Sequence, residues 1–177
     1  MTPRVPPASA RELGLVNAAI AWASGRAAGG RPLNLFTTLG RARGLFRGWL
    51  HFASRLMPFG RLARRDTELV ILRVAHLRAC EYERRHHLQI GRRAGLTDAD
   101  FARVTEGPQA AGWSDRERAI LQAVDELDAA RSISDPTWEA LRAQLDARRL
   151  VELVLLATHY EMLATVIATL GIEPDSA

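Results

Sequence analysis

The chain of 177 residues contains no lysine, because all 24 of its basic residues are arginine. It therefore lacks the flexible lysine clusters that make many phosphate contacts. The 20 acidic residues are interspersed with the arginines, and the formal net charge is only +4. No long basic run and no RNA-binding signature is present, so the composition argues against nucleic acid as a partner.

Cysteine is also scarce, since Cys80 is the only one. A single cysteine cannot close an internal disulfide, which fits a reducing compartment and predicts a cytoplasmic protein. A long uninterrupted apolar run is missing as well. The most apolar stretch, near residues 150–170, is interrupted by Glu152, His159 and Glu161. We therefore predict a core helix there and no membrane partner.

The length and the hydrophobic content of 47% are sufficient for one well-buried domain. Near the N-terminus, Ser9 and Glu12 have the spacing of a capping box, which predicts an ordinary helix start rather than a signal peptide. Residues 1–8 contain three prolines and are predicted to be a flexible arm. Residues 9–174 are predicted to form a single helical domain.

Apolar residues recur at helical spacing, and no successive stretches alternate as half-buried strands do, so we predict an all-α fold of about seven helices. Predicted helix starts share a side chain that can accept first-turn amide hydrogen bonds: Ser9, Asp66, Thr97, Ser114, Asp135 and Asp146. Predicted helix ends share glycine or proline: Gly29–Gly30, Pro58, Gly95, Gly107–Pro108 and Gly171. The last helix, from Arg148 to Leu170, is apolar nearly all round. It either crosses the centre of the monomer or is covered in a homo-oligomer.

Residues 80–87, with the sequence CEYERRHH, are the most chemically distinctive stretch. Cys80, Glu83 and His87 have the spacing i, i+3, i+7 and share one face of a predicted helix, where Glu83 and His87 are close enough to touch. Tyr82 and His86 form a second pair on an adjoining face. A carboxylate beside an imidazole can orient it and increase its basicity, which is typical of a general acid/base pair.

Two simpler interpretations of this stretch stay open. Polar residues at this spacing often form a solvated face with a salt bridge, and a lone cysteine is often a small core residue. The stretch does not match the H-E-x-x-H pattern of zinc sites, so we expect no metal.

The residues from Glu68 to Thr97 resemble a known superfamily. The segment ELVILRVA at residues 68–75, then Cys80 to Glu83, His87 and RAGLT at residues 93–97 are similar to carboxymuconolactone decarboxylases and alkylhydroperoxidase D-like proteins. The peroxidase branch has a glutamate, eleven residues, and then Cys-x-x-Cys-x-x-x-His. This chain has the same spacing with Glu83 in place of the second cysteine. The stretch from Val151 to Pro174 also resembles the last helix of the tyrosine-glutamate subgroup.

The resemblance implies an all-helical protomer, commonly a dimer, trimer or hexamer, without a cofactor or metal. It implies catalytic roles for Glu68 as a relay carboxylate, Cys80 at the resolving position, Tyr82 beside the relay and His87 as the relay imidazole. Glu83 stands where relatives have the thiol that attacks peroxide. Because a carboxylate cannot form a sulfenic acid, the two-cysteine peroxidase cycle is excluded.

Three functional hypotheses follow. The first is a cofactor-independent acid/base enzyme, such as a lyase, that acts on a small carboxylated or lactone-like molecule through Glu83 and His87. The second is a one-cysteine peroxidase of the peroxiredoxin type that uses Cys80. The third is a non-catalytic oligomer that binds a small ligand.

Candidate substrate-binding residues for the first hypothesis are Arg73 and Arg84, as anchors for an anion, and His159 in the last helix. In one continuous helix Glu68 and Cys80 would lie roughly 18 Å apart. A shared site therefore requires a break in the helix, which we place around Leu77 to Cys80.

Overall fold

The computed structural model describes residues 3–28 and 30–175, and these residues form nine helices and no strand. The all-α prediction is confirmed, with two helices more than the seven or so expected. The chain divides into two compact units, residues 59–165 and the remainder on either side of that segment. Each unit is described by itself.

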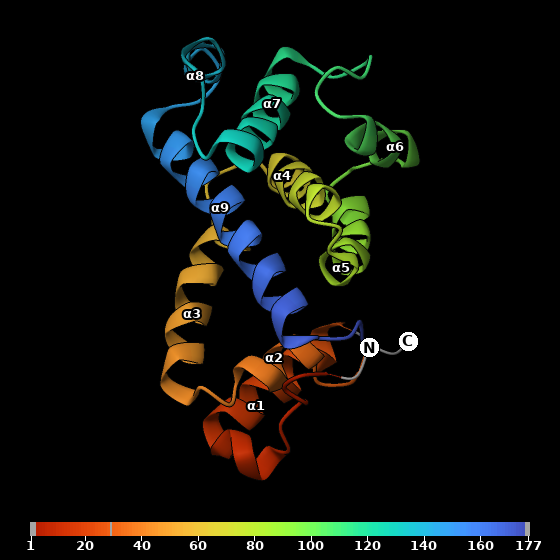
Figure 1. Ribbon diagram of the computed structural model, residues 1–177, viewed down its shortest axis with the longest axis vertical. Coiled ribbons are helices and arrows are strands. Elements are labelled where there is room, and N and C mark those ends of the chain that lie inside the picture. The colour runs from red at the N-terminus through yellow and green to blue at the C-terminus, as the bar shows by residue number, and fades with distance from the viewer. Residues whose placement is uncertain (1–2, 29, 176–177) are drawn as a thin grey trace. The chain divides into compact units, whose positions relative to one another are not determined.

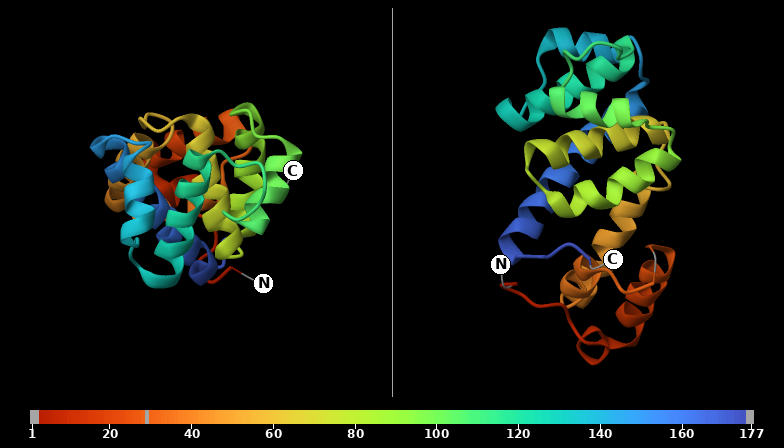
Figure 2. Two further views of the ribbon diagram at one scale, coloured as in Figure 1. Left: turned by 90° about the horizontal axis from the view of Figure 1, so that it is seen from above. Right: turned by 90° about the vertical axis from the view of Figure 1, so that its right-hand side faces the viewer.

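The unit of residues 59–165 is organised around α4 (Arg64–Leu77), whose residues from Asp66 to Ala75 are all buried. The helix packs against α5 (Glu81–Arg93), α6 (Asp98–Glu106) and α7 (Asp115–Ala130). Figure 1 shows α4 between α5 and α7, and the right-hand view of Figure 2 shows α4 and α5 running side by side. α8 (Asp135–Arg142) packs on α7, and the first part of α9 (Ala147–Leu170) completes the unit.

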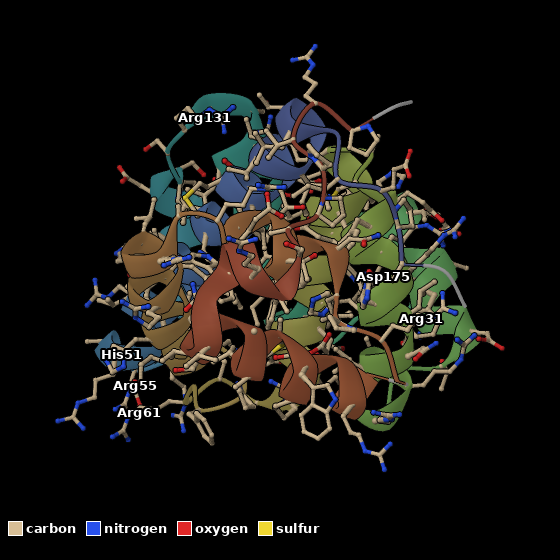
Figure 3. The ribbon with its side chains drawn as sticks, turned by 90° about the horizontal axis from the view of Figure 1, so that it is seen from below. Arg31, His51, Arg55, Arg61, Arg131 and Asp175 are labelled. Atoms are coloured by element: carbon tan, nitrogen blue, oxygen red, sulfur yellow. The ribbon has the colours of Figure 1, made fainter. Side chains whose placement is uncertain are left out.

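The other unit contains α1 (Ala10–Ala28), α2 (Asn34–Leu39) and α3 (Arg43–Leu56). Aromatic rings of Phe36, Phe46 and Trp49 pack together with centroids 5.7 to 5.9 Å apart. His51 and Arg55, one turn apart on α3, lie at the surface (Figure 3). Part of the arm predicted to be flexible is held in this unit, because the Arg4 amide donates to the Leu170 carbonyl at 2.9 Å.

Several predicted helix boundaries are confirmed by capping contacts. Thr97 and Ser114 each form a complete capping box, with Asp100 and Glu117. Asp146 accepts a hydrogen bond from the Arg149 amide at 2.9 Å. Gly95, Gly107 and Gly171 have positive φ angles where helices end. Of the predicted Gly29–Gly30 stop, Gly29 lies outside the described residues.

Two predicted starts are wrong in detail. α4 begins at Arg64 with Ala63 at its N-cap, so Asp66 lies inside the first turn and pairs with Arg116. α8 has Ser134 at its N-cap, and Asp135 is its first residue. In both cases the acidic side chain favours the first turn through the helix dipole without being the cap.

α9 is the one helix among the described residues that is long and apolar enough to cross a membrane by length and composition. Half of its most apolar window is buried inside the protein. Such burial is what a core helix of a globular protein shows, which agrees with the prediction of a core helix.

The predicted break between α4 and α5 is present. α4 ends at Leu77, Ala79 takes a left-handed conformation with φ of 48°, and the Cys80 amide donates to the Ala75 carbonyl at 2.8 Å. The chain thereby reverses, and residues of α4 and α5 that are far apart in sequence come to face one another.

Gly107 lies where the guanidinium of Arg73 packs against the loop after α6. It has φ of 99° and ψ of −165°, a conformation almost restricted to glycine. A Cβ at this position would lie 2.8 Å from Nη2 of Arg73. Gly95 also has a positive φ, but a Cβ there would meet no atom within 4 Å.

We expect Gly107→Ala to lower the free energy of unfolding by about 1–3 kcal/mol from backbone strain, with a further loss from displacing Arg73. Gly95→Ala is the matched control, because it carries strain without the steric conflict, and it should cost less. Urea unfolding of both variants measures the difference. Equal losses would contradict the role given to Arg73.

Candidate active site

A buried carboxylate and a buried imidazole meet between α4 and α5. Glu68 is 0% exposed, and its Oε2 lies 2.7 Å from Nδ1 of His87. The other ring nitrogen, Nε2, lies 3.3 Å from the hydroxyl of Tyr160 on α9. The two rings are edge to face, with centroids 5.3 Å apart. Both nitrogens of His87 are thus oriented by groups from other helices.

The charge of Glu68 is balanced by Arg64, which the sequence pattern does not single out. Nη2 of Arg64, one turn earlier on α4, lies 3.0 Å from Oε1 of Glu68. A buried carboxylate requires such partners, because an uncompensated charge in the interior costs several kcal/mol. Arg64 and His87 together hold both oxygens of Glu68.

Glu83 is a second buried carboxyl group, and its surroundings differ from those of Glu68. Its side chain is 3% exposed, and neither oxygen has a hydrogen-bond partner of normal geometry among the described residues. Burial raises the pKa of Glu83 to about 8, although the nearby Cys80 thiol opposes this. At neutral pH the side chain therefore carries a proton for most of the time.

Cys80 immediately precedes α5 and is buried. Burial, followed by the negative charge of Glu83, raises the pKa of the Cys80 thiol to about 12. The thiolate is the nucleophilic form of cysteine, and these surroundings disfavour it.

Tyr160 and His159 contribute two buried polar groups from α9. Burial, together with the charges of Glu68 and Glu83, raises the pKa of Tyr160 well above its usual value, while Arg64 opposes the shift. His159 stacks edge-on against Tyr160 at 5.4 Å, and burial lowers its pKa to about 4. Both side chains are uncharged near neutral pH.

Other residues predicted for the site lie elsewhere in the unit. Tyr82 is buried and stacks on His86 with ring centroids 4.6 Å apart. Arg84 is on the exposed side of α5, where its Nε lies 2.6 Å from Glu81. The structure thus places Arg84 away from the Glu68–His87 pair, with its guanidinium held by Glu81.

Arg73, which the sequence suggested as an anion anchor, makes its contacts away from the Glu68–His87 pair. Its Nε and Nη2 donate to Asp125 at 2.6 and 2.8 Å, and its Nη1 donates to the Val104 carbonyl at 2.7 Å. These contacts join α4 to α6 and α7. Arg73 therefore stabilises the fold of this unit.

The sequence pattern alone does not single out Arg64 or Tyr160 as residues of this site. Arg64 has the i, i+4 spacing to Glu68 that predicts a helical ion pair, and this signal was available. Tyr160 adjoins His159, but only packing shows that its hydroxyl faces His87. Within the described part of the chain, no three His, Cys, Asp or Glu side chains are placed to hold a metal ion.

A family model described as the carboxymuconolactone decarboxylase family matches residues 43–126, a range that includes Glu68, Cys80, Glu83 and His87. Together with the similar solved structures, this match supports the carboxymuconolactone decarboxylase and alkylhydroperoxidase D-like superfamily for the chain. The predicted family is confirmed. No curated protein matches the sequence.

Solved structures show that the chain has the alkylhydroperoxidase D-like fold. A peroxidase-related protein from Ralstonia eutropha is 20% identical, with a TM-score of 0.86 over 99% of this chain and 94% of that one. One from Silicibacter is 15% identical, with a TM-score of 0.82 over 99% and 95%. The debrominase Bmp8 is 14% identical, with a TM-score of 0.76 over 97% of this chain and 92% of its own.

The raised pKa of Glu83 predicts how stability changes with pH. Folding raises the pKa of this acid from 4.5 to about 8, so the folded state binds the proton more tightly. Between these two pKa values the free energy of unfolding falls as pH rises. The unfolded chain releases this proton readily, whereas the folded chain must keep it or leave a buried charge without a partner. We expect Glu83→Gln to be more stable than the native chain by up to about 3 kcal/mol near pH 7, with a smaller gain near pH 5.

Urea unfolding at the two pH values measures this gain. Glu81→Gln is the matched control, because Glu81 is ion-paired with Arg84 and Arg85, and these contacts lower its pKa to about 2. Its neutralisation should leave stability unchanged or slightly reduced. A Glu83→Gln variant that is less stable than the native chain at about pH 7 would contradict an unpaired, protonated Glu83.

Proposed function

We propose that the protein is a cofactor-independent acid/base enzyme acting on a small carboxylated or lactone-like molecule. The observation that carries the proposal is the contrast between two buried carboxyl groups beside one imidazole. Glu68 is paired with His87 at 2.7 Å, whereas Glu83 has no hydrogen-bond partner of normal geometry among the described residues, and its pKa is raised to about 8. Titratable groups with opposed environments are characteristic of acid and base partners in catalysis.

In the proposed mechanism His87 is the base. Glu68 accepts a hydrogen bond from Nδ1, which leaves the lone pair on Nε2 and stabilises the imidazolium that forms when Nε2 takes a proton. Glu83 is the acid, because it is protonated at neutral pH and can give its proton to the substrate. His87 gains one proton from the substrate and Glu83 gives one to it, so the net charge of the site is unchanged. After each turnover His87 loses its proton to water and Glu83 takes one from water.

Arg64 is the arginine placed to anchor a substrate carboxylate. Its Nη2 holds Glu68, while its Nη1 is buried without a hydrogen-bond partner among the described residues. A guanidinium can bind a second carboxylate through its remaining donors. The similarity to a debrominase whose cysteine-to-alanine variant is solved in complex with 2,3,4-tribromopyrrole supports a small molecule as the ligand of this fold.

The one-cysteine peroxidase hypothesis is weakened by the state of Cys80. With the thiol pKa raised to about 12, on the order of one molecule in 10⁵ carries the thiolate at about pH 7. The peroxidase-related names of similar structures keep this hypothesis worth testing. The non-catalytic hypothesis predicts no turnover by any variant.

We expect Glu83→Gln and His87→Gln each to reduce turnover by about a hundred- to ten-thousandfold, because each removes a positioned acid or base. A panel of small lactones and carboxylated compounds, followed by NMR, would identify the substrate, and Glu81→Gln is the matched control. Cys80→Ser should retain this turnover. The peroxidase hypothesis would be favoured if the native chain turned over peroxide but no lactone, and if Cys80→Ser lost the peroxide turnover.

We also propose a cytoplasmic homo-oligomer that uses the outward side of α9. Val151, Leu155 and Met162 lie on one helical face and are 61%, 42% and 47% exposed. A stripe of large apolar side chains on one helix is costly to leave in water and is suited to packing on a second copy.

We expect sedimentation at micromolar concentration to give a mass well above the 19.6 kDa of one chain. Replacing Leu155 and Met162 with glutamate should lower the measured mass towards that of the monomer, because buried unpaired charges disfavour association. A monomer in the native chain would contradict the proposed assembly.

A further inference from the structure

Two uncharged O–H groups belong to the surroundings of His87: Glu83 is one turn earlier on α5, and Tyr160 comes from α9. Glu83 is buried with no hydrogen-bond partner of normal geometry for its carboxyl oxygens among the described residues. The hydroxyl of Tyr160 lies 3.3 Å from Nε2 of His87. Glu83 and Tyr160 are therefore related through His87, which follows Glu83 by four residues on α5 and contacts the Tyr160 hydroxyl.

The charges around these two groups decide which ligand they suit. The titratable and charged side chains around Glu83 and Tyr160 come from three helices. They are Arg64 and Glu68 on α4, Cys80 at the N-cap of α5, His87 within α5, and His159 on α9. The cation of this set, Arg64, is paired with Glu68. Glu83 and Tyr160 can therefore offer hydrogen bonds without a positive charge. Such donors suit an oxygen that becomes negative only during the reaction.

We propose that Glu83 and Tyr160 together stabilise the carbonyl oxygen of a small enolisable compound as it becomes an enolate, with His87 as the base. This inference rests on the proposed function and deepens it. It adds Tyr160 as a catalytic residue, and it names the substrate class as a carbonyl compound with an acidic C–H next to the carbonyl group. At the enolate stage Glu83 donates a hydrogen bond, and it gives up its proton only in the acid step of the proposed function, which Glu83→Gln removes.

The proton transfer balances without a co-reactant. Nε2 of His87 takes the proton from the carbon beside the carbonyl, so a C–H bond breaks and an N–H bond forms. The electron pair moves onto the carbonyl oxygen, which accepts hydrogen bonds from both O–H groups. Return of the proton to carbon regenerates the imidazole. The contact between the Tyr160 hydroxyl and Nε2 of His87, at 3.3 Å, is long for a hydrogen bond donated by a hydroxyl, so a negatively charged substrate oxygen can compete with Nε2 for this donor.

Binding of a phenolate tests the pair directly, because its oxygen has the charge and geometry of an enolate oxygen. The probe is pentafluorophenol, which is ionised at neutral pH and is observed by fluorine NMR with the full chain. We expect Tyr160→Phe and Glu83→Ala each to weaken its binding by roughly ten- to hundredfold, the effect of removing a hydrogen bond to a charged oxygen. Glu81→Gln should bind as the native chain does.

The pH dependence isolates Glu83. In the native chain the affinity should fall as pH rises through about 8, because an ionised Glu83 neither donates a hydrogen bond nor tolerates an anion beside it. Glu83→Gln keeps an uncharged donor of the same size, so it should bind nearly as well as the native chain and lose this fall. The measurement remains decisive if Glu83→Ala does not fold.

The outcomes separate this inference from the proposed function. Absence of phenolate binding, or binding that Tyr160→Phe leaves unchanged, overturns the pair. If lactone turnover still depends on Glu83 and His87 in that case, the proposed function stands without it. Phenolate binding that is weakened by Tyr160→Phe and by Glu83→Ala supports the pairing of Glu83 with Tyr160. This holds even if the lactone panel gives no turnover, a result that counts against the proposed function alone.

Discussion

The hydrogen bond between Glu68 and His87 is the contact on which the organisation of the site depends. It joins residues 19 positions apart in the sequence across two helices, at 2.7 Å in a buried environment. A charged Glu68 with 0% exposure is tolerable only with compensating partners, and Arg64 and His87 supply them. The reversal at Ala79 makes this meeting possible. Without that break, the carboxylate and the imidazole would lie far apart along one helix.

The same small region keeps two carboxyl groups in different states. Glu68 has an arginine and a histidine on its two oxygens, whereas Glu83 has burial and no partner of normal geometry among the described residues. Burial alone favours the protonated acid, which is why the pKa of Glu83 rises to about 8. Glu83 stands where the resemblance to peroxidases implies a thiol, and under the proposed function its protonated form donates a proton or a hydrogen bond. An unpaired buried acid costs stability, and function is a common reason for retaining one.

The sequence predicts the local features well because they depend on neighbouring residues. The capping boxes at Thr97 and Ser114, the turn after α4 and the glycine-marked helix ends follow from side chains within a few positions of one another. Tertiary choices were less predictable. Spacing suggested that Glu83 would orient His87, but the imidazole is oriented by Glu68 and Tyr160 from other helices. Arg73 looked like an anchor, and only packing shows that Asp125 and the Val104 carbonyl occupy its donors.

The protonation of Glu83 is the central claim, since both the acid role and the hydrogen-bond role need it. Infrared spectroscopy detects the carbonyl stretch of a protonated carboxylic acid, and subtracting the spectrum of Glu83→Gln isolates this residue. The account predicts a protonated-acid band from Glu83 near pH 6.5 that disappears as pH rises through about 8. A carboxylate signal from Glu83 at about pH 6.5, with no protonated band, would contradict the account.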